Sequence, residues 1–201
     1  MTDAYIVGAV RSAGGKKNGR LSKIHPIDLG AEVVDALVAK TGVAVSEIDD
    51  LIFGCVSQVG AQSSNIARNI CLSSVLGEVV PGTTVDRQCG SGQQAMHFAA
   101  QGVLSGTQDL VIAGGVESMS QVPIGANIID GYKAEHGLPY GKKMSERYPG
   151  VQFNQFAGAE MLAHKYELTQ NELNAFAFDS HVKAKRAVLE GRFKDEIVAI
   201  V

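Results

Sequence analysis

The sequence has little that would direct the chain to nucleic acid, to a membrane or out of the cell. Its formal net charge is −3 over 201 residues, so it presents no basic field for nucleic acid. No segment approaches the roughly 18 consecutive apolar residues of a membrane span. The opening stretch MTDAYIVGAVRSAGG has an acid ahead of its apolar run, where a signal peptide has basic residues. We therefore expect a cytoplasmic protein with no nucleic-acid partner and no membrane partner.

Cysteine is also scarce, and the three residues present fit neither a disulfide framework nor a zinc site. Their number is odd, and no two of them form a C-x-x-C pair. Cys55 and Cys71 have apolar neighbours, which is typical of buried, unreactive thiols. We expect no bound metal. Cys89 differs from the other two cysteines because its neighbours are polar or small.

What the sequence does contain is a clear α/β pattern. Hydrophobic residues make up 45% of the chain and charged residues 19%, which is enough apolar side chain for a packed core. After Pro26, the residues Leu29, Val33 and Leu37 recur at helical spacing. Because short apolar strands alternate with helical segments, we expect an α/β fold with helices on the faces of a sheet. The predicted strands cover 4–10, 51–59, 81–88 and 108–118, and the predicted helices begin at 26, 63 and 90.

The pattern changes in the later part of the chain. The stretch 122–150 has no sustained period, which indicates a long excursion from the first part. Two helices are predicted after it, one over 155–166 and one that starts with a capping box, Thr169 and Glu172, and stops at Gly191. The last residues, DEIVAIV, look like the start of a strand.

The stretch VDRQCGSGQQA contains two patterns at once. Gly90, Gly92 and Ala95 fit the G-x-G-x-x-A loop that cradles a dinucleotide. Cys89 comes immediately before them, where a nucleophile stands at the start of a helix. The partial positive charge of a helix N-terminus stabilises a thiolate, and its N–H groups can receive the oxyanion of a tetrahedral intermediate.

The residues that lead into the glycines favour the nucleophile. A dinucleotide-binding strand is apolar up to its first glycine, whereas TTVDRQC ends in polar residues. The small residues that follow Cys89 leave room for a bulky acyl thioester. A small buried cysteine at a tight helix entrance is the alternative that the residues leave open.

Two stretches together resemble the thiolases, the enzymes that make or cleave 3-oxoacyl-CoA: VDRQCGSGQQA and DLVIAGGVESMSQVP. YIVGAVRSAGGKKNGRLSKI, GCVSQVGAQSSNIARNI and ELTQNELNAFAFDSHVKAKRA also resemble segments of this family, so the resemblance covers the whole chain. It implies a thiolase-like layered α/β fold, with an N-terminal βαβαβα unit and a mixed sheet. The nucleophile-bearing domain would be 1–121, and 122–201 would be an incomplete inserted loop domain.

The resemblance implies an acyltransferase in which Cys89 is the acyl-accepting nucleophile. Acyl groups would pass between Cys89 and coenzyme A, in a Claisen condensation or in the thiolytic cleavage of 3-oxoacyl-CoA. The substrate is then a coenzyme A thioester, as in fatty acid metabolism, and no tightly bound cofactor is needed. The resemblance also implies a homodimer or a tetramer.

The resemblance gives further residues supporting roles, and each has a simpler alternative. Asn65 and Arg68 match a segment that supports the site and the dimer interface, although Arg68 alone is typical of a solvated helix position. Glu117 matches a polar residue behind the site, but it is more simply a hydrogen-bonded structural acid. In the loop domain, cations would face the coenzyme A phosphates and apolar residues would line an acyl channel, unless they are solvated or ordinarily packed: Lys133, Lys142, Lys143 and Arg147, and Met144 and Phe153.

Three departures separate the chain from the family pattern. Asp86 stands where many thiolases have asparagine, and a carboxylate there opposes thiolate formation unless it is paired. FNQFAGAEM replaces a His-Met pair of biosynthetic members, which favours a broader or degradative acyl-CoA substrate. Family members are about twice as long, and their second half supplies an activating histidine and a second cysteine. The isolated chain should therefore turn over very slowly unless a separate C-terminal half binds it, and a non-catalytic acyl-CoA-binding or dimerisation module is the alternative.

Overall fold

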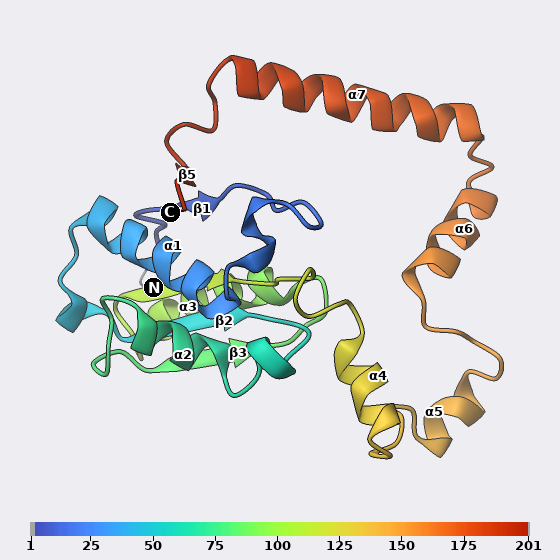
Figure 1. The fold of residues 1–201 in the computed structure, drawn as a ribbon, viewed down its shortest axis with the longest axis horizontal. Coiled ribbons are helices and arrows are strands. Elements are labelled where there is room, and N and C mark those ends of the chain that lie inside the picture. The colour runs from blue at the N-terminus through green and yellow to red at the C-terminus, as the bar shows by residue number, and fades with distance from the viewer. Residues whose placement is uncertain (1–2, 201) are drawn as a thin grey trace. The chain divides into compact units, whose positions relative to one another are not determined.

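The computed structural model describes residues 3–200 (Figure 1), and its contacts divide the chain into two units. The first unit extends to His136 and includes the segment from Glu196 onward, and the second unit is Gly137–Asp195. The boundary expected between domains 1–121 and 122–201 lies inside the first unit. The division into those two domains therefore stays a prediction.

A three-stranded parallel sheet forms the centre of the first unit, with strand order β3-β2-β4. One helix connects β2 to β3 and another connects β3 to β4, which is the crossover that parallel strands require. At the C-terminal edge of the sheet, Gly54 pairs with Val85 on one side and with Gly115 on the other. The strands are β2 (Asp50–Gly54), β3 (Gly82–Val85) and β4 (Val111–Gly115).

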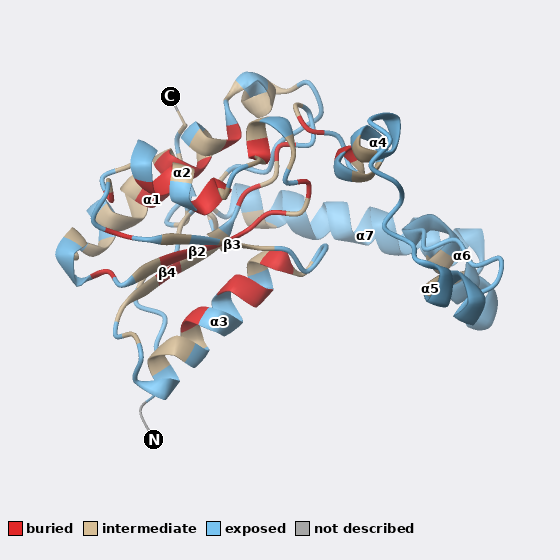
Figure 2. Cartoon of the chain, turned by 90° about the horizontal axis from the view of Figure 1, so that it is seen from below, coloured by how far each residue is buried: buried red, intermediate tan, exposed pale blue. Residues whose placement is uncertain are grey.

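Helices cover both faces of this sheet, as the sequence pattern predicts (Figure 2). Two helices, α1 and α2, lie on one face, and α3 lies on the other. Because side chains alternate along a strand, β2 contributes to both layers of core. Leu51 and Phe53 are buried with α1 and α2, whereas Ile52 is buried against α3. The helices are α1 (Pro26–Thr41), α2 (Ile66–Ser73) and α3 (Ser91–Ser105).

The helix α1 begins and ends where its sequence signals predict. It has Pro26 and Asp28 in its first turn, and it is followed by Gly42, whose φ of 68° lies in the left-handed region that favours glycine. Its N-cap is His25, whose Nδ1 accepts a hydrogen bond from the N–H of Ile27 at 3.3 Å. His25 therefore has a structural role at the start of this helix.

The strand predicted for residues 4–10 is wrong. In the described N-terminal segment, strand pairing is limited to β1 (Arg11–Ser12), which pairs with β5 (Ile197–Val198) from the other end of the chain. An ion pair at 2.7 Å joins Arg11 to Glu196 beside this pair. An apolar run becomes a strand only where a neighbour satisfies its N–H and C=O groups, and Tyr5 within this run is 78% exposed. All strand pairs within residues 3–200 are parallel, so the mixed sheet is not seen in this part of the chain.

The remaining helices fall in both units, and no residue of α5, α6 or α7 is buried. α7 begins at the predicted capping box: Glu172 Oε2 accepts from the N–H of Thr169 at 2.8 Å, and Thr169 Oγ1 accepts from the N–H of Glu172 at 3.3 Å. No helix in the described part of the chain has the length and hydrophobicity to cross a membrane. The bounds are α4 (Ala126–Lys133), α5 (Lys142–Arg147), α6 (Gln155–Lys165) and α7 (Gln170–Leu189), so the excursion at 122–150 contains two short helices.

Candidate active site

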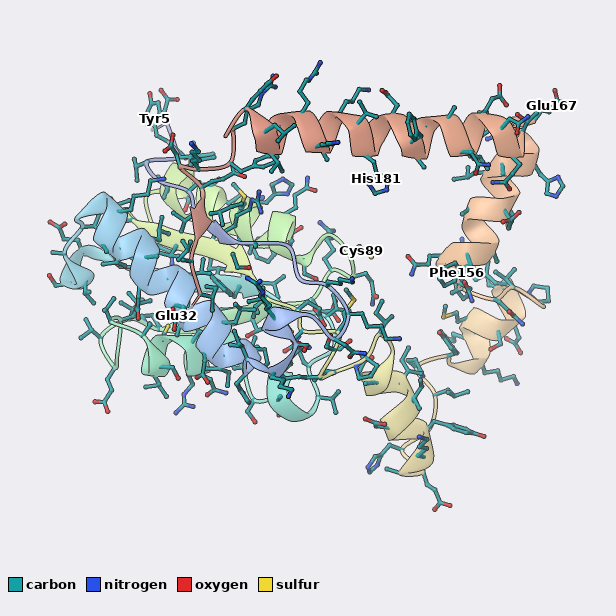
Figure 3. The ribbon with its side chains drawn as sticks, turned by 45° about the horizontal axis from the view of Figure 1, so that its top comes forward. Tyr5, Glu32, Cys89, Phe156, Glu167 and His181 are labelled. Atoms are coloured by element: carbon teal, nitrogen blue, oxygen red, sulfur yellow. The ribbon has the colours of Figure 1, made fainter. Side chains whose placement is uncertain are left out.

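Cys89 lies between the end of β3 and the start of α3, at the C-terminal edge of the parallel sheet. This edge is where open α/β sheets place their binding groups. The thiol is exposed (Figure 3), whereas Cys55 and Cys71 are buried. The prediction of two buried thiols is confirmed, and the alternative of a buried Cys89 is excluded.

The turn that carries Cys89 is held by side-chain hydrogen bonds to its own backbone. Asp86 Oδ1 accepts from the N–H of Gln88 at 2.8 Å, and Gln88 has a φ of 49°, which is uncommon for a residue other than glycine. The buried Ser91 Oγ accepts from the N–H of Arg87 at 2.8 Å and donates to the carbonyl of Gln88 at 2.6 Å. These bonds make the turn a fixed part of the start of α3.

Arg87 and Asp86 have different partners. The Nη1 of Arg87 donates to Oε1 of Gln94, a buried side chain of α3. Asp86 is an acceptor within the turn itself. The hydrogen bond from Arg87 to Gln94 attaches the turn to α3.

The start of α3 has no capping side chain, and the N–H groups of Gly90 and Ser91 donate to the carbonyls of Arg87 and Gln88 at 3.1 and 3.0 Å. Its N-cap is Gly90, and the helix begins at Ser91. The first N–H groups of any helix have no acceptor within the helix and carry partial positive charge, so Cys89 stands beside a set of amide dipoles. Since β3 ends at Val85, residues 86–89 separate the strand from the glycines. This is unlike a dinucleotide loop, in which the strand leads directly into the first glycine.

The other two thiols are kept neutral by their surroundings. Burial raises the pKa of the Cys55 thiol to about 12, with further contributions from the negative charges of Glu117 and Asp86. Burial also raises the pKa of Cys71 to about 11, helped by Asp50. Both shifts favour the neutral thiol near neutral pH. Within residues 3–200, no group of three His, Cys, Asp or Glu side chains is arranged to hold a metal ion.

Glu117 is an acceptor that joins two segments at the same sheet edge. It accepts from the N–H of Val56 at 2.7 Å, from the N–H of Ser57 at 3.1 Å and from Nε2 of Gln62 at 3.0 Å. Gln62 is fully buried, and its Oε1 accepts from the N–H of Ser118 at 2.6 Å. This network favours the structural role of Glu117. The sequence gives no signal for Gln62, because a buried glutamine in an irregular segment belongs to no periodic pattern.

Asn65 attaches α2 to β3. Its Oδ1 accepts from the N–H of Arg68 at 3.3 Å and from Oγ1 of Thr84 at 2.7 Å, and its Nδ2 donates to the carbonyl of Gly82 at 2.7 Å. The side chain of Arg68 is exposed, with Nη1 at 3.4 Å from Oδ1 of Asn69. Asn65 is thus the N-cap of α2, and a role of either residue in a dimer interface stays a prediction.

The cations assigned to coenzyme A fall in different units. Lys133 ends α4 in the first unit, and the other three lie on α5 in the second. Lys142 pairs with Glu146 at 3.6 Å, and the guanidinium of Arg147 lies 5.8 Å from the ring centre of Tyr148. Their role toward the phosphates stays a prediction.

Each unit contains a cavity. In the second unit, Met144 and Phe153 line a pocket of about 390 Å³ with Tyr140 and Tyr148. The ring of Tyr148 meets Phe153 edge-on, with centroids 5.5 Å apart. The structure brings the two predicted residues together, and their use as an acyl channel stays a prediction. A larger cavity of about 850 Å³ lies between α1 and the outer edge of β4, and Cys89 does not line it.

Comparison with known proteins decides the family. Residues 4–201 match the family described as the thiolase N-terminal domain. The chain belongs to the thiolase family. The resemblance carried by VDRQCGSGQQA and DLVIAGGVESMSQVP is therefore confirmed.

Several curated thiolases are similar to this chain over its full length. The steroid 3-ketoacyl-CoA thiolase FadA6 of Mycobacterium tuberculosis is 43% identical, over 100% of this chain and 50% of its own. The 3-ketoacyl-CoA thiolases of Acinetobacter baumannii and Bacillus subtilis are 41% and 40% identical, over 98% and 100% of this chain and 48% and 49% of their own. The chain spans about half the length of the curated thiolases it matches.

Proposed function

We propose that this chain carries the nucleophile of a thiolase-type acyltransferase. In the proposed step, the sulfur of Cys89 attacks the carbonyl carbon of an acyl-CoA thioester. A bond forms between this carbon and the Cys89 sulfur, the bond from the carbon to the coenzyme A sulfur breaks, and the Cys89 proton ends on coenzyme A. The reverse step returns the acyl group, so one cysteine serves both the condensation and the thiolytic cleavage of 3-oxoacyl-CoA.

The observation that carries the proposal is a single exposed thiol at the N-terminus of a helix that has no capping side chain. The other two thiols are buried and have raised pKa values, so we assign the nucleophile to Cys89. Amide N–H groups at such a helix start stabilise the oxyanion of the tetrahedral intermediate, and loss of one donor of this kind costs about 100- to 1000-fold in rate.

Nucleophilic catalysis also needs a base, and the proposal places it outside the matched half. Of the histidines near the sheet, His25 caps α1 through its Nδ1, and His97 is exposed on α3. We therefore assign the base to a part like the other half of the relatives, carried on the same polypeptide or on a separate one. The chain without that part should acylate once and turn over very slowly.

Mass spectrometry tests the acylation directly. After incubation with acetyl-CoA, we expect one acetyl group on the peptide that contains Cys89, and release of free coenzyme A. Cys89→Ala should abolish the adduct, and Cys55→Ala should retain it as the matched control. An adduct that persists in Cys89→Ala contradicts the proposal. Calorimetric binding of acetyl-CoA without any adduct supports the non-catalytic binding module instead.

The proposal also covers the substrate class, the assembly and the location. We propose acyl-CoA substrates of fatty acid metabolism, and relatives named 3-ketoacyl-CoA thiolases support a 3-oxoacyl-CoA substrate. We further propose a homodimer or tetramer in the cytoplasm. Light scattering over a range of concentrations should give the mass of two or four chains, and a single-chain mass throughout contradicts the assembly.

A further inference from the structure

The first turn of α3 lies directly on the end of β2, at Gly54. A β-carbon added to Gly54 would be 2.7 Å from the carbonyl oxygen of Ser91, and it would overlap the Ser91 carbonyl carbon and the Gly92 nitrogen. These are backbone atoms, so no side-chain rotation relieves the overlap. Glycine within a strand often marks such a close approach of another backbone.

The neighbouring strand also presents bare backbone here. The register partner of Gly54 on β4 is Gly115, where an added β-carbon would lie 2.9 Å from the Gly54 oxygen and 3.5 Å from the Cα of Gly92. Gly54 is held in place because its carbonyl accepts from the N–H of Val116 at 3.0 Å and because β2 is paired on both sides. A side chain at this position would therefore displace the helix and not the strand.

Such a displacement would reach Cys89, because Ser91 ties the turn to the helix through Arg87 and Gln88. We propose that Gly54 is a positioning residue for Cys89, a role that rests on the proposed function. Its missing side chain lets the first turn of α3 approach the sheet, which sets where the thiol and the amide donors meet the acyl carbonyl. A misplacement of about 1 Å can cost 100-fold in rate.

The same sheet provides a matched control at α2. A β-carbon on Gly82 would lie 2.6 Å from the nitrogen of Arg68 and 2.7 Å from the carbonyl carbon of Ala67, in the first turns of α2. Gly82→Ala therefore forces a helix away from a strand through the same kind of backbone contact. That helix carries no cysteine at its N-terminus, so general destabilisation is separated from misplacement of the thiol.

The experiment compares Gly54→Ala and Gly82→Ala by two rates on the Cys89 peptide. One is alkylation by iodoacetamide, which requires a reactive thiol, and the other is acetylation by acetyl-CoA, which also requires the amide donors. We expect Gly54→Ala to lower acetylation by about tenfold or more and alkylation by about threefold, and Gly82→Ala to change each less than twofold. Near-UV circular dichroism and a urea midpoint show that both variants are folded.

If Gly54→Ala does not fold, Gly115→Ala replaces it, since its contact with Gly92 is looser, and a smaller loss of acetylation of about threefold is expected. Equal losses in the folded variant and in Gly82→Ala overturn the positioning role, as does an unchanged ratio of acetylation to alkylation. Absence of acetylation in the unsubstituted chain counts against the proposed function alone. In that case the alkylation rates still decide whether Gly54 positions the thiol.

Discussion

The helices α2 and α3 pack against the same sheet through similar backbone contacts, but their N-termini differ chemically. Each rests its first turns on a strand glycine, Gly82 for α2 and Gly54 for α3. The start of α2 is closed by Asn65, whose side chain accepts from the helix and bonds to β3. The start of α3 has only Gly90 as its cap, beside the exposed Cys89. The same sheet thus carries one helix start that is capped by a side chain and one that is not.

Removing the Cys89 sulfur at the start of α3 should have the largest effect on the reactivity of the chain toward thiol reagents. In Cys89→Ser, only Cys55 and Cys71 remain, with pKa values raised to about 12 and about 11. A raised thiol pKa keeps the neutral form below that pH, so both are deprotonated to about one part in a thousand or less near pH 8. We expect iodoacetamide labelling to slow by about 100-fold or more, as measured by mass spectrometry.

The residual labelling gives a pH test of the same point. It should rise by about tenfold per pH unit up to about pH 11, because each unit exposes more of the buried thiols as thiolate. The unsubstituted chain labels at Cys89 throughout this range. Fast labelling of Cys89→Ser near neutral pH would show that the two buried thiols are accessible, and the contrast between the sites would fail.

Removing the Asn65 cap at the start of α2 should lower the free energy of unfolding without changing the reactivity of Cys89. Asn65→Ala removes the cap of α2 together with the bonds to Gly82 and Thr84, so we expect the free energy of unfolding to fall by about 2 kcal/mol. Asn65→Asp keeps the cap acceptor but puts a carboxylate oxygen against the Gly82 carbonyl, so it should restore only part of the lost stability. Urea denaturation measures both. The alkylation rate of Cys89 should stay within about twofold, and a larger change would show that the two helix ends are coupled.

The smallest effect is expected at the left-handed residues that precede the helices. Asn65 and Gln88 have φ values of 57° and 49°, and asparagine tolerates this region better than glutamine does. Gln88→Gly should therefore stabilise the chain by about 0.5 kcal/mol, measured as a shift in the thermal midpoint. Asn65→Gly is the matched change, and it should destabilise because the cap bonds are lost. Stabilisation by both changes would show that backbone strain outweighs the cap.

The helix ends were predictable because their signals are local. Pro26, Gly42 and the Thr169–Glu172 capping box each act within one turn of the chain, and the structure places helix ends at all three. Cys89 at the start of α3 follows from the same kind of local pattern. Its family assignment needed the longer motifs as well, since a cysteine before a glycine-rich turn is common to several chemistries.

The features that failed or went unseen depend on partners far along the chain. The apolar run at 4–10 has a strand-like composition and lacks a paired neighbour in the structure. Gly54 is one glycine among 23, and its contact is with a helix that starts at Ser91. The acceptor role of Glu117 joins Val56 to the end of β4 in the same non-local way. Periodicity and capping describe neighbours in sequence, so they carry no information on such contacts.

Gly54, at the end of β2, also helps to fix the register of the sheet. Side chains alternate between the two faces, so sliding β2 by one residue would put Phe53 beneath α3 and turn Gly54 into the opposite core. A phenyl ring cannot occupy space that already rejects a methyl group, and the other core would be left with a void. The absence of a side chain at Gly54, which lets α3 pack closely, therefore also disfavours the shifted register during folding. This selection for the correct register acts next to the turn that carries Cys89.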